Sequence, residues 1–191
     1  MLNIEFKKGK WEEFLDCAYT ARYELKPKFV QESDHIRNCE SKENECGFDQ
    51  TTILTKQKYA AGTKISTCCS FDKDYAPLLI FANNLYKDSE NDLRFDDYYE
   101  VVLYKDGINV WRLYKDSAEN KMKWHLLLGV NFKVTPKEKH TLTVELAEKA
   151  FKIKCGSEDI VLRIADLPKQ MHAGITACEG INRFYSLDIE D

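Results

Sequence analysis

The chain has 191 residues, 43% of them hydrophobic and 31% charged, which is the size and composition of one globular domain with a sizeable core. The formal net charge is −4, and the densest basic stretch, residues 133–139, is diluted by Pro136 and Glu138, so no nucleic-acid partner is expected. No apolar run approaches the roughly 18 residues of a membrane span, which excludes a membrane partner at this level.

The first ten residues, MLNIEFKKGK, lack the apolar core of a secretory leader. Unless a leader precedes this chain, we therefore expect a cytoplasmic protein. The number of cysteines is odd, and the sequence contains no C-x-x-C pair. We therefore expect reduced thiols that pack as small hydrophobic side chains. The seven cysteines are Cys17, Cys39, Cys46, Cys68, Cys69, Cys155 and Cys178.

Taken in chain order, the hydrophobic pattern predicts about a dozen strands and little helix. Residues 11–23 could form one or two helical turns, because their first apolar side chains have helical spacing. Residues 34–49 and 87–97 are polar or acidic and are predicted to be loops. Strands are expected at residues 29–37, 51–56, 63–71, 77–82, the hairpin 98–114, 123–128, 141–146, 151–154, 159–163, 173–177 and 184–189.

Turn signals recur about every 8–12 residues along this series, which is typical of an all-β sandwich or barrel. The run at residues 77–82, PLLIFA, is continuously apolar and predicts a strand that is buried on both faces. The sequence therefore predicts a single all-β domain over residues 1–191, built as an antiparallel two-sheet sandwich.

The hairpin at residues 98–114, YYEVVLYKDGINVWRLY, carries the most specific signal. Its two β-branched and aromatic runs meet at Asp106-Gly107, a pair that favours the positive φ angles of a two-residue hairpin turn. A turn at that pair predicts that Val102 lies opposite Trp111.

Alternation divides this hairpin into two faces. One face carries Val101, Leu103 and Val110 and is expected to face the core. The other combines aromatic rings with a carboxylate and an amide, which suits a sugar: a ring stacks on its apolar side, and the polar groups bind vicinal hydroxyls. That second face carries Tyr98, Glu100, Tyr104, Asn109 and Trp111, of which Tyr98, Glu100, Asn109 and Trp111 are predicted to bind the ligand. The competing interpretation is that the rings pack in the core and Glu100 is a surface acid or an ion-pair partner.

Three further side chains are weaker ligand-binding candidates. Arg112 lies on the core face at a strand end, where it either reaches the rim or pairs with a buried acid. Glu179 and Arg183 belong to the turn CEGINR, which either contacts a ligand at the end of a sandwich or only serves turn geometry.

The C-terminal pattern, AGI at residues 173–175 followed by NRFYSLDI at residues 182–189, resembles the closing strand pair of the concanavalin A-like lectin/glucanase sandwiches. The positions of Trp111 and Trp124, at the end of one strand and the start of another, fit the same strand order. The resemblance implies a jelly roll of two curved antiparallel sheets whose concave face usually takes carbohydrate. The glucanase signature E-x-D-x-x-E and the galectin pattern are absent, so the chain looks most like the non-catalytic carbohydrate-binding modules and the laminin-G-like members.

Asp188 lies near the position where this family commonly holds calcium, but no D-x-D-x-D loop supplies the six to eight oxygens that calcium needs. The histidines are scattered, which argues against zinc. No cofactor is therefore expected, and Asp188 is retained only as a weak calcium candidate.

Three hypotheses follow. The first is a carbohydrate-binding protein. The second is a glycoside hydrolase or lyase that uses Glu100 with a second acid or with Tyr98, which would need two carboxyl groups in one groove. The third is a protein-interaction domain whose groove is filled by its own side chains or whose edge strand is paired. The sequence favours no particular oligomeric state.

Overall fold

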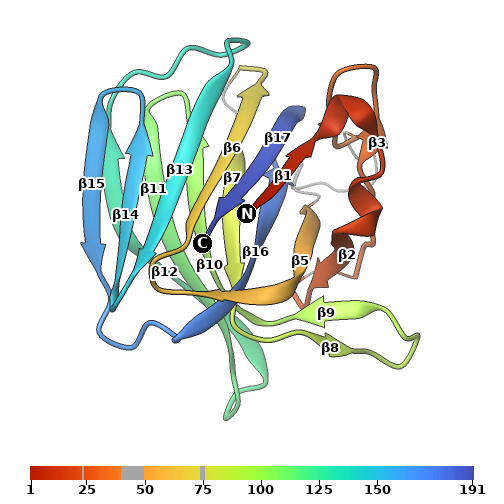
Figure 1. Cartoon of the computed structure of the whole chain (residues 1–191). Helices are drawn as coiled ribbons and strands as arrows, with labels where there is room; N and C mark the ends of the chain where they lie inside the picture. Colours follow the sequence, from red (N-terminus) through yellow and green to blue (C-terminus); the bar gives the residue numbers. More distant parts are fainter. Residues whose placement is uncertain (23, 40–49, 74–75) are drawn as a thin grey trace.

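Two β-sheets stacked face to face make up the computed structural model, which describes residues 1–22, 24–39, 50–73 and 76–191 (Figure 1). Most of the predicted loop at residues 34–49, with Cys46, lies outside the described residues. The remaining six cysteines are free thiols. Among the described residues, no helix has the length and apolar character that a membrane span requires.

The first sheet has eight strands and contains both ends of the chain, since β1 (Leu2–Glu5) pairs with β17 (Asn182–Glu190) (Figure 1). The order of its other strands is β15 (Glu158–Arg163), β14 (Ala150–Cys155), β13 (His140–Ala147), β6 (Lys64–Phe71), β17, β4 (Ile36–Arg37) and β3 (Val30–Gln31).

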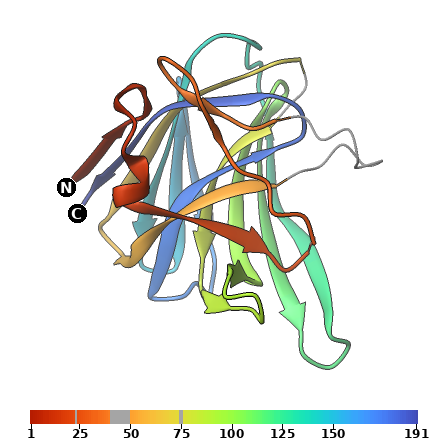
Figure 2. The same ribbon diagram turned by 90° about the vertical axis from the view of Figure 1, so that its right-hand side faces the viewer.

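The second sheet has nine strands in the order β12 (Lys121–Asn131), β11 (Gly107–Asp116), β10 (Asp97–Tyr104), β7 (Ala76–Ala82), β16 (Gln170–Cys178), β5 (Thr51–Ala60), β2 (Leu15–Thr20), β9 (Leu93–Phe95) and β8 (Tyr86–Lys87). Figure 2 shows β11 and β12, in green and teal, on the side of the molecule opposite the chain ends. Pairings between described strands are antiparallel, with one parallel exception between β2 and β9.

The predicted all-β, two-sheet sandwich is confirmed, with 17 strands among the described residues in place of about a dozen. The additional strands are mostly short edge pieces of two to four residues, such as β8 and β9, which are too short to show alternation. The predicted helical turns at residues 11–23 are only partly correct. Trp11–Glu13 forms the 3₁₀ turn η2, which follows a similar turn η1 (Phe6–Lys8), whereas Leu15–Thr20 is strand β2 because it pairs with β5 and β9.

Strand β7 is buried over its whole length, as its apolar sequence predicts. Leu79 and Phe81 face the core between the sheets, where the Phe81 ring lies 5.0 Å from the ring of Phe151. Leu78 and Ile80 face the opposite way and belong to a second apolar cluster on the outer face of the nine-stranded sheet. That cluster includes Phe95 of β9, so part of this outer face is covered by the chain itself.

The hairpin of β10 and β11 turns one residue earlier than predicted. Gly107 pairs with Tyr104, the turn consists of Lys105 and Asp106, and neither has positive φ. Gly107 serves another purpose: at φ 136° its missing side chain leaves room for β12, because a Cβ atom there would lie 1.9 Å from the carbonyl oxygen of Val130. Glycine at this position therefore permits close approach of a strand rather than a tight turn.

The earlier turn moves every cross-strand partner by two residues without changing the faces. Glu100 lies opposite Trp111, and Val102 lies opposite Asn109 rather than Trp111. Because a partner shift of two residues preserves the side-chain alternation, Glu100 and Trp111 remain together on the outer face.

Candidate functional site

A hollow of about 200 Å³ lies on the outer face of the nine-stranded sheet, where the hairpin of β10 and β11 meets the end of β16. It combines two tryptophans, two glutamates, an arginine and an amide with a small apolar floor. The lining residues are Arg22, Gln50, Ala76, Leu78, Glu100, Val102, Trp111, Leu113, Trp124, Cys178 and Glu179. Three of the seven predicted ligand-binding residues, Glu100, Trp111 and Glu179, are thus brought together here.

Glu100 is the most unusual group in the hollow because it is a carboxyl with only 6% of its surface exposed. Its position on β10 points it to the outer face, where it lies opposite Ile80 of β7 and Trp111 of β11. Burial raises the pKa of Glu100 to about 7, although a hydrogen bond from Gln50 and the charge of Arg22 act in the opposite direction. Near neutral pH this carboxyl can therefore either donate or accept a proton.

Gln50 holds Glu100 in place and is itself 4% exposed. Its Nε2 group donates a hydrogen bond of 2.7 Å to Oε1 of Glu100. Within the described part of the chain, Oε1 of Gln50 is buried without a hydrogen-bond partner. An unsatisfied buried acceptor costs about 1–3 kcal/mol, so a ligand hydroxyl that reached this oxygen would recover free energy.

Two indole rings lie beside this polar pair. Trp111 of β11 is half-buried, and Trp124 of β12 is 54% exposed. Leu113 is directly opposite Trp124 across β11 and β12, which sets the two indoles on the same outer face as diagonal neighbours. The guanidinium of Arg22 lies 4.9 Å from the centre of the Trp124 ring, a cation–π contact at the rim.

Glu179 and Cys178 complete the hollow from the end of β16. Glu179 has a φ angle of 57° and is half-buried, and burial raises its pKa. The pKa of Cys178 is also raised, chiefly by desolvation on burial and further by the charges of Glu100 and Glu179. The Cys178 thiol therefore stays protonated and is a poor nucleophile.

The other four predicted ligand-binding residues do not line the hollow. Tyr98 is fully buried; its hydroxyl lies 3.0 Å from Oγ1 of Thr20, and its ring packs against Phe95. Asn109 is on the same outer face, next to Gly129. The remaining two are arginines, which both pair with acids.

Arg112 forms an ion pair with Asp97 and lies 4.5 Å from the ring centre of Tyr99. Pairing with an acid is one of the two arrangements that its sequence position allowed, and Asp97 is partly buried. Arg183 binds Asp72 through two hydrogen bonds of 3.0 and 3.2 Å, and the ion pair lowers the pKa of Asp72. Both guanidinium groups thus serve local structure away from the hollow.

Sequence reasoning did not select Gln50, Arg22 or Trp124 for the site. Gln50 directly precedes β5 and Arg22 lies just after β2, so both are outside the alternation of their strands and no local pattern marks them. Trp124 begins a predicted strand, but the face that it shares with Trp111 is set by the register of β11 with β12, which places Leu113 opposite Trp124. Only the fold brings these three side chains to one place.

Within the described ranges, no three His, Cys, Asp or Glu side chains come together in a way that could hold a metal ion. Asp188, the weak calcium candidate, accepts hydrogen bonds from Asn3 and from Ser186. Each of its two carboxylate oxygens thus accepts one hydrogen bond.

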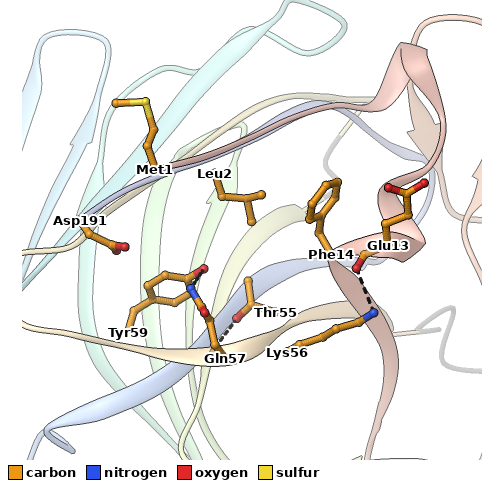
Figure 3. Close-up of a pocket in the computed structure, with 9 residues that line it drawn as sticks. All are labelled: Met1, Leu2, Glu13, Phe14, Thr55, Lys56, Gln57, Tyr59 and Asp191. Carbon is orange, nitrogen blue, oxygen red and sulfur yellow. Dashed lines mark hydrogen bonds between the residues drawn. The ribbon is translucent and has the colours of Figure 1, made fainter.

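A second hollow, of about 320 Å³, lies near the chain ends (Figure 3). Its polar groups bind one another: Lys56 donates to the carbonyl of Glu13, and Gln57 donates to the hydroxyl of Tyr59. Among the described residues that line it, no buried acceptor lacks a hydrogen-bond partner, so it is the weaker ligand site. Its lining consists of Met1, Leu2, Glu13, Phe14, Thr55, Lys56, Gln57, Tyr59 and Asp191.

Comparison with protein-family models finds no match, and neither does comparison with curated proteins. Solved structures do match. The carbohydrate-binding module CBM66 from Bacillus subtilis is 10% identical with a TM-score of 0.62, over 91% of this chain and 99% of that one. A glycoside hydrolase family 16 endo-glucanase from Bacteroides ovatus is 9% identical with a TM-score of 0.62, over 99% of both chains.

The exoplasmic/lumenal domain of VIP36, in its form bound to Ca²⁺ and Man3GlcNAc, is 10% identical with a TM-score of 0.56, over 95% of this chain and 85% of that one. At such low identity these matches concern the fold. They show that the chain, with its two stacked sheets, has the concanavalin A-like β-sandwich fold.

Proposed function

We propose that this protein binds a mono- or oligosaccharide in the hollow at Glu100. The observation that carries the proposal is the buried pair of Gln50 and Glu100 beside Trp111, in which the amide oxygen of Gln50 has no hydrogen-bond partner among the described residues. A sugar complements both the polar pair and the indole ring, because its hydroxyls donate hydrogen bonds and one side of its ring is apolar.

The structural likeness to a carbohydrate-binding module and to a sugar-bound lectin domain supports the same class of ligand. Aromatic side chains give large contact area at low entropic cost, so Trp111 and Trp124 would supply most of the affinity. The polar pair would fix the orientation of the hydroxyls.

The proposal is tested by a glycan array followed by calorimetry, with three proteins: the unmodified chain, Trp111→Ala and Tyr86→Ala. Tyr86 is an exposed aromatic residue outside the hollow and controls for loss of a surface ring. We expect saturable binding to a defined set of glycans that Tyr86→Ala retains and Trp111→Ala loses. Failure of the unmodified chain to bind any glycan, or equal binding by all three proteins, would contradict the proposal.

A glycoside hydrolase remains the alternative, favoured by one observation: Glu100 is joined in the hollow by a second carboxyl, that of Glu179, and burial raises both pKa values. Glu100 would protonate the leaving oxygen, and Glu179 would act as base or nucleophile. Release of nitrophenol from nitrophenyl glycosides tests this alternative. Activity that Glu100→Gln and Glu179→Gln each abolish would establish it, and binding without turnover would refute it.

A further inference from the structure

A lysine-rich hollow lies on the other sheet. This hollow, of about 800 Å³, is bounded by the segment 132–134, by β13 and by the turn between β14 and β15. Four lysines and one histidine line it against a single acid, Glu158, although the whole chain has a net charge of −4. The charged and hydroxyl-bearing residues of the lining are Lys64, Lys133, Lys139, His140, Thr141, Thr143, Lys154, Ser157 and Glu158.

The wall that carries Lys133 is held rigidly. Backbone N–H groups of Phe132 and Val134 donate to the carbonyls of Asp106 and Lys105 at 3.0 and 2.9 Å, and the N–H of Lys137 donates to the carbonyl of Phe71 at 2.8 Å. These bonds tie the segment to the β10–β11 turn and to β6. The basic wall is therefore positioned by the fold before any ligand arrives.

The floor of this hollow is the outer face of β13. Thr141 and Thr143 project into the hollow, because they alternate along the strand with Leu142 and Val144, which belong to the core. Lys154 lies directly opposite Thr143 on β14. A row of hydroxyls beside ammonium groups is the combination that binds the oxygens of an anion.

Two of the four lysines are already engaged. Lys64 pairs with Glu190 at 3.2 Å, an exposed contact, and the ammonium of Lys139 lies 3.7 Å from the ring centre of Tyr185. For Lys133 and Lys154, the described residues provide no ion-pair partner. Their positive charges repel those of Lys64 and Lys139, and a bound anion would relieve that repulsion.

We propose that this basic hollow binds a small organic molecule bearing a sulfate or phosphate ester. Its volume is in the range of small-molecule sites, roughly 300–1,000 Å³. The acidity of the rest of the chain favours a small anion over nucleic acid, because a long polyanion would extend beyond the lysines onto acidic surface. The site lies on the opposite sheet from the hollow at Glu100 and does not depend on the function proposed for it.

The test is calorimetric titration of the full chain with glucose 6-phosphate, glucose 6-sulfate and glucose at constant ionic strength. The variant Lys133→Gln/Lys154→Gln removes the two lysines for which the described part of the chain provides no ion-pair partner. The control Lys115→Gln/Lys169→Gln makes the same change in charge at exposed lysines outside this hollow. A third variant, Lys133→Arg/Lys154→Arg, keeps the charge and reports whether substitution itself disturbs the fold.

We expect both esters, or one of them, to bind at least about tenfold more tightly than glucose. The glutamine variant at 133 and 154 should lose about tenfold in affinity, while the control and the arginine variant stay within about twofold. Tighter binding of one ester would identify the preferred group as phosphate or sulfate. Equal affinity for glucose, or equal loss in the control variant, would overturn the proposal, as would tighter binding of duplex DNA with a steep salt dependence.

Discussion

Glu100 lies directly opposite Trp111 across β10 and β11, and both side chains line one hollow on the outer face of the sheet. This pairing joins a buried carboxyl with a pKa raised to about 7 to a large apolar ring. Two residues away on the same strand, Tyr98 is sealed beneath Phe95. The outer face of β10 is thus open at Glu100 and covered at Tyr98. Substitutions at the two positions should therefore affect binding and stability differently.

Trp124→Ala is expected to weaken sugar binding with little effect on folding. The ring is 54% exposed on the edge strand β12, so its removal should change the free energy of unfolding by less than about 1 kcal/mol. Affinity should fall about tenfold through lost stacking area. Calorimetry and thermal unfolding measure the two effects, and a large loss of stability with unchanged affinity would assign the ring to structure alone.

Gln50→Leu is expected to raise the pKa of Glu100 further. The Gln50 amide now donates to Oε1 of Glu100, which lowers the carboxyl pKa, and leucine cannot make that hydrogen bond. The same variant removes the amide oxygen that has no hydrogen-bond partner in the described ranges, so sugar affinity should fall by about tenfold. NMR titration of the carboxyl carbon of Glu100 reports the first effect, and an unchanged or lower pKa would contradict it.

Glu100→Gln is expected to be more stable than the unmodified protein at pH 8 and nearly equal at pH 4. Burial raises the Glu100 pKa from 4.5 to about 7, so the folded state holds a proton that the unfolded state releases, and stability falls as the pH rises through this window. The difference amounts to about 3 kcal/mol, and glutamine avoids it.

Urea unfolding at several pH values measures this difference. Glu138→Gln makes the same change of residue at an exposed surface position and is the matched control. A stability gap between Glu100→Gln and the unmodified chain that does not grow with pH would contradict the prediction.

Tyr98→Phe is expected to leave sugar binding unchanged. The hydroxyl of Tyr98 lies 3.0 Å from that of Thr20 in a buried contact, so its removal should cost about 1 kcal/mol of stability through the lost hydrogen bond. A drop in affinity without a drop in stability would return Tyr98 to the binding site. The two measurements are made on the same preparation.

Gly107→Ala is expected to destabilise the hairpin that carries the hollow, by about 2–4 kcal/mol. The new Cβ atom would lie 1.9 Å from the carbonyl oxygen of Val130 and would push β12 away from β11. Gly62→Ala is the control, because Gly62 also has positive φ, at 101°, but a Cβ atom added there would have no neighbouring atom within 4 Å. Equal effects of the two substitutions in thermal unfolding would show that the backbone angle, and not the contact, sets the cost.

Much of the sandwich could be read from the chain because strand alternation is a local property. The predicted strand at residues 141–146 lies within β13, and the predicted strand at residues 184–189 lies within β17. The face shared by Glu100 and Trp111 was predicted even though the turn was placed one residue too late, since this error moves the partners by two residues and leaves both on one face. The short β8 and β9 gave no such signal because they have only two and three residues.

The sequence alone determined which side chains share a face, since neighbouring residues of a strand must point in opposite directions. Which part of that face stays open was decided by tertiary structure. Phe95 covers Tyr98 while Gln50 and Glu179, distant in the chain, meet around Glu100. Such convergence depends on the packing of segments far apart in sequence, which no local pattern encodes.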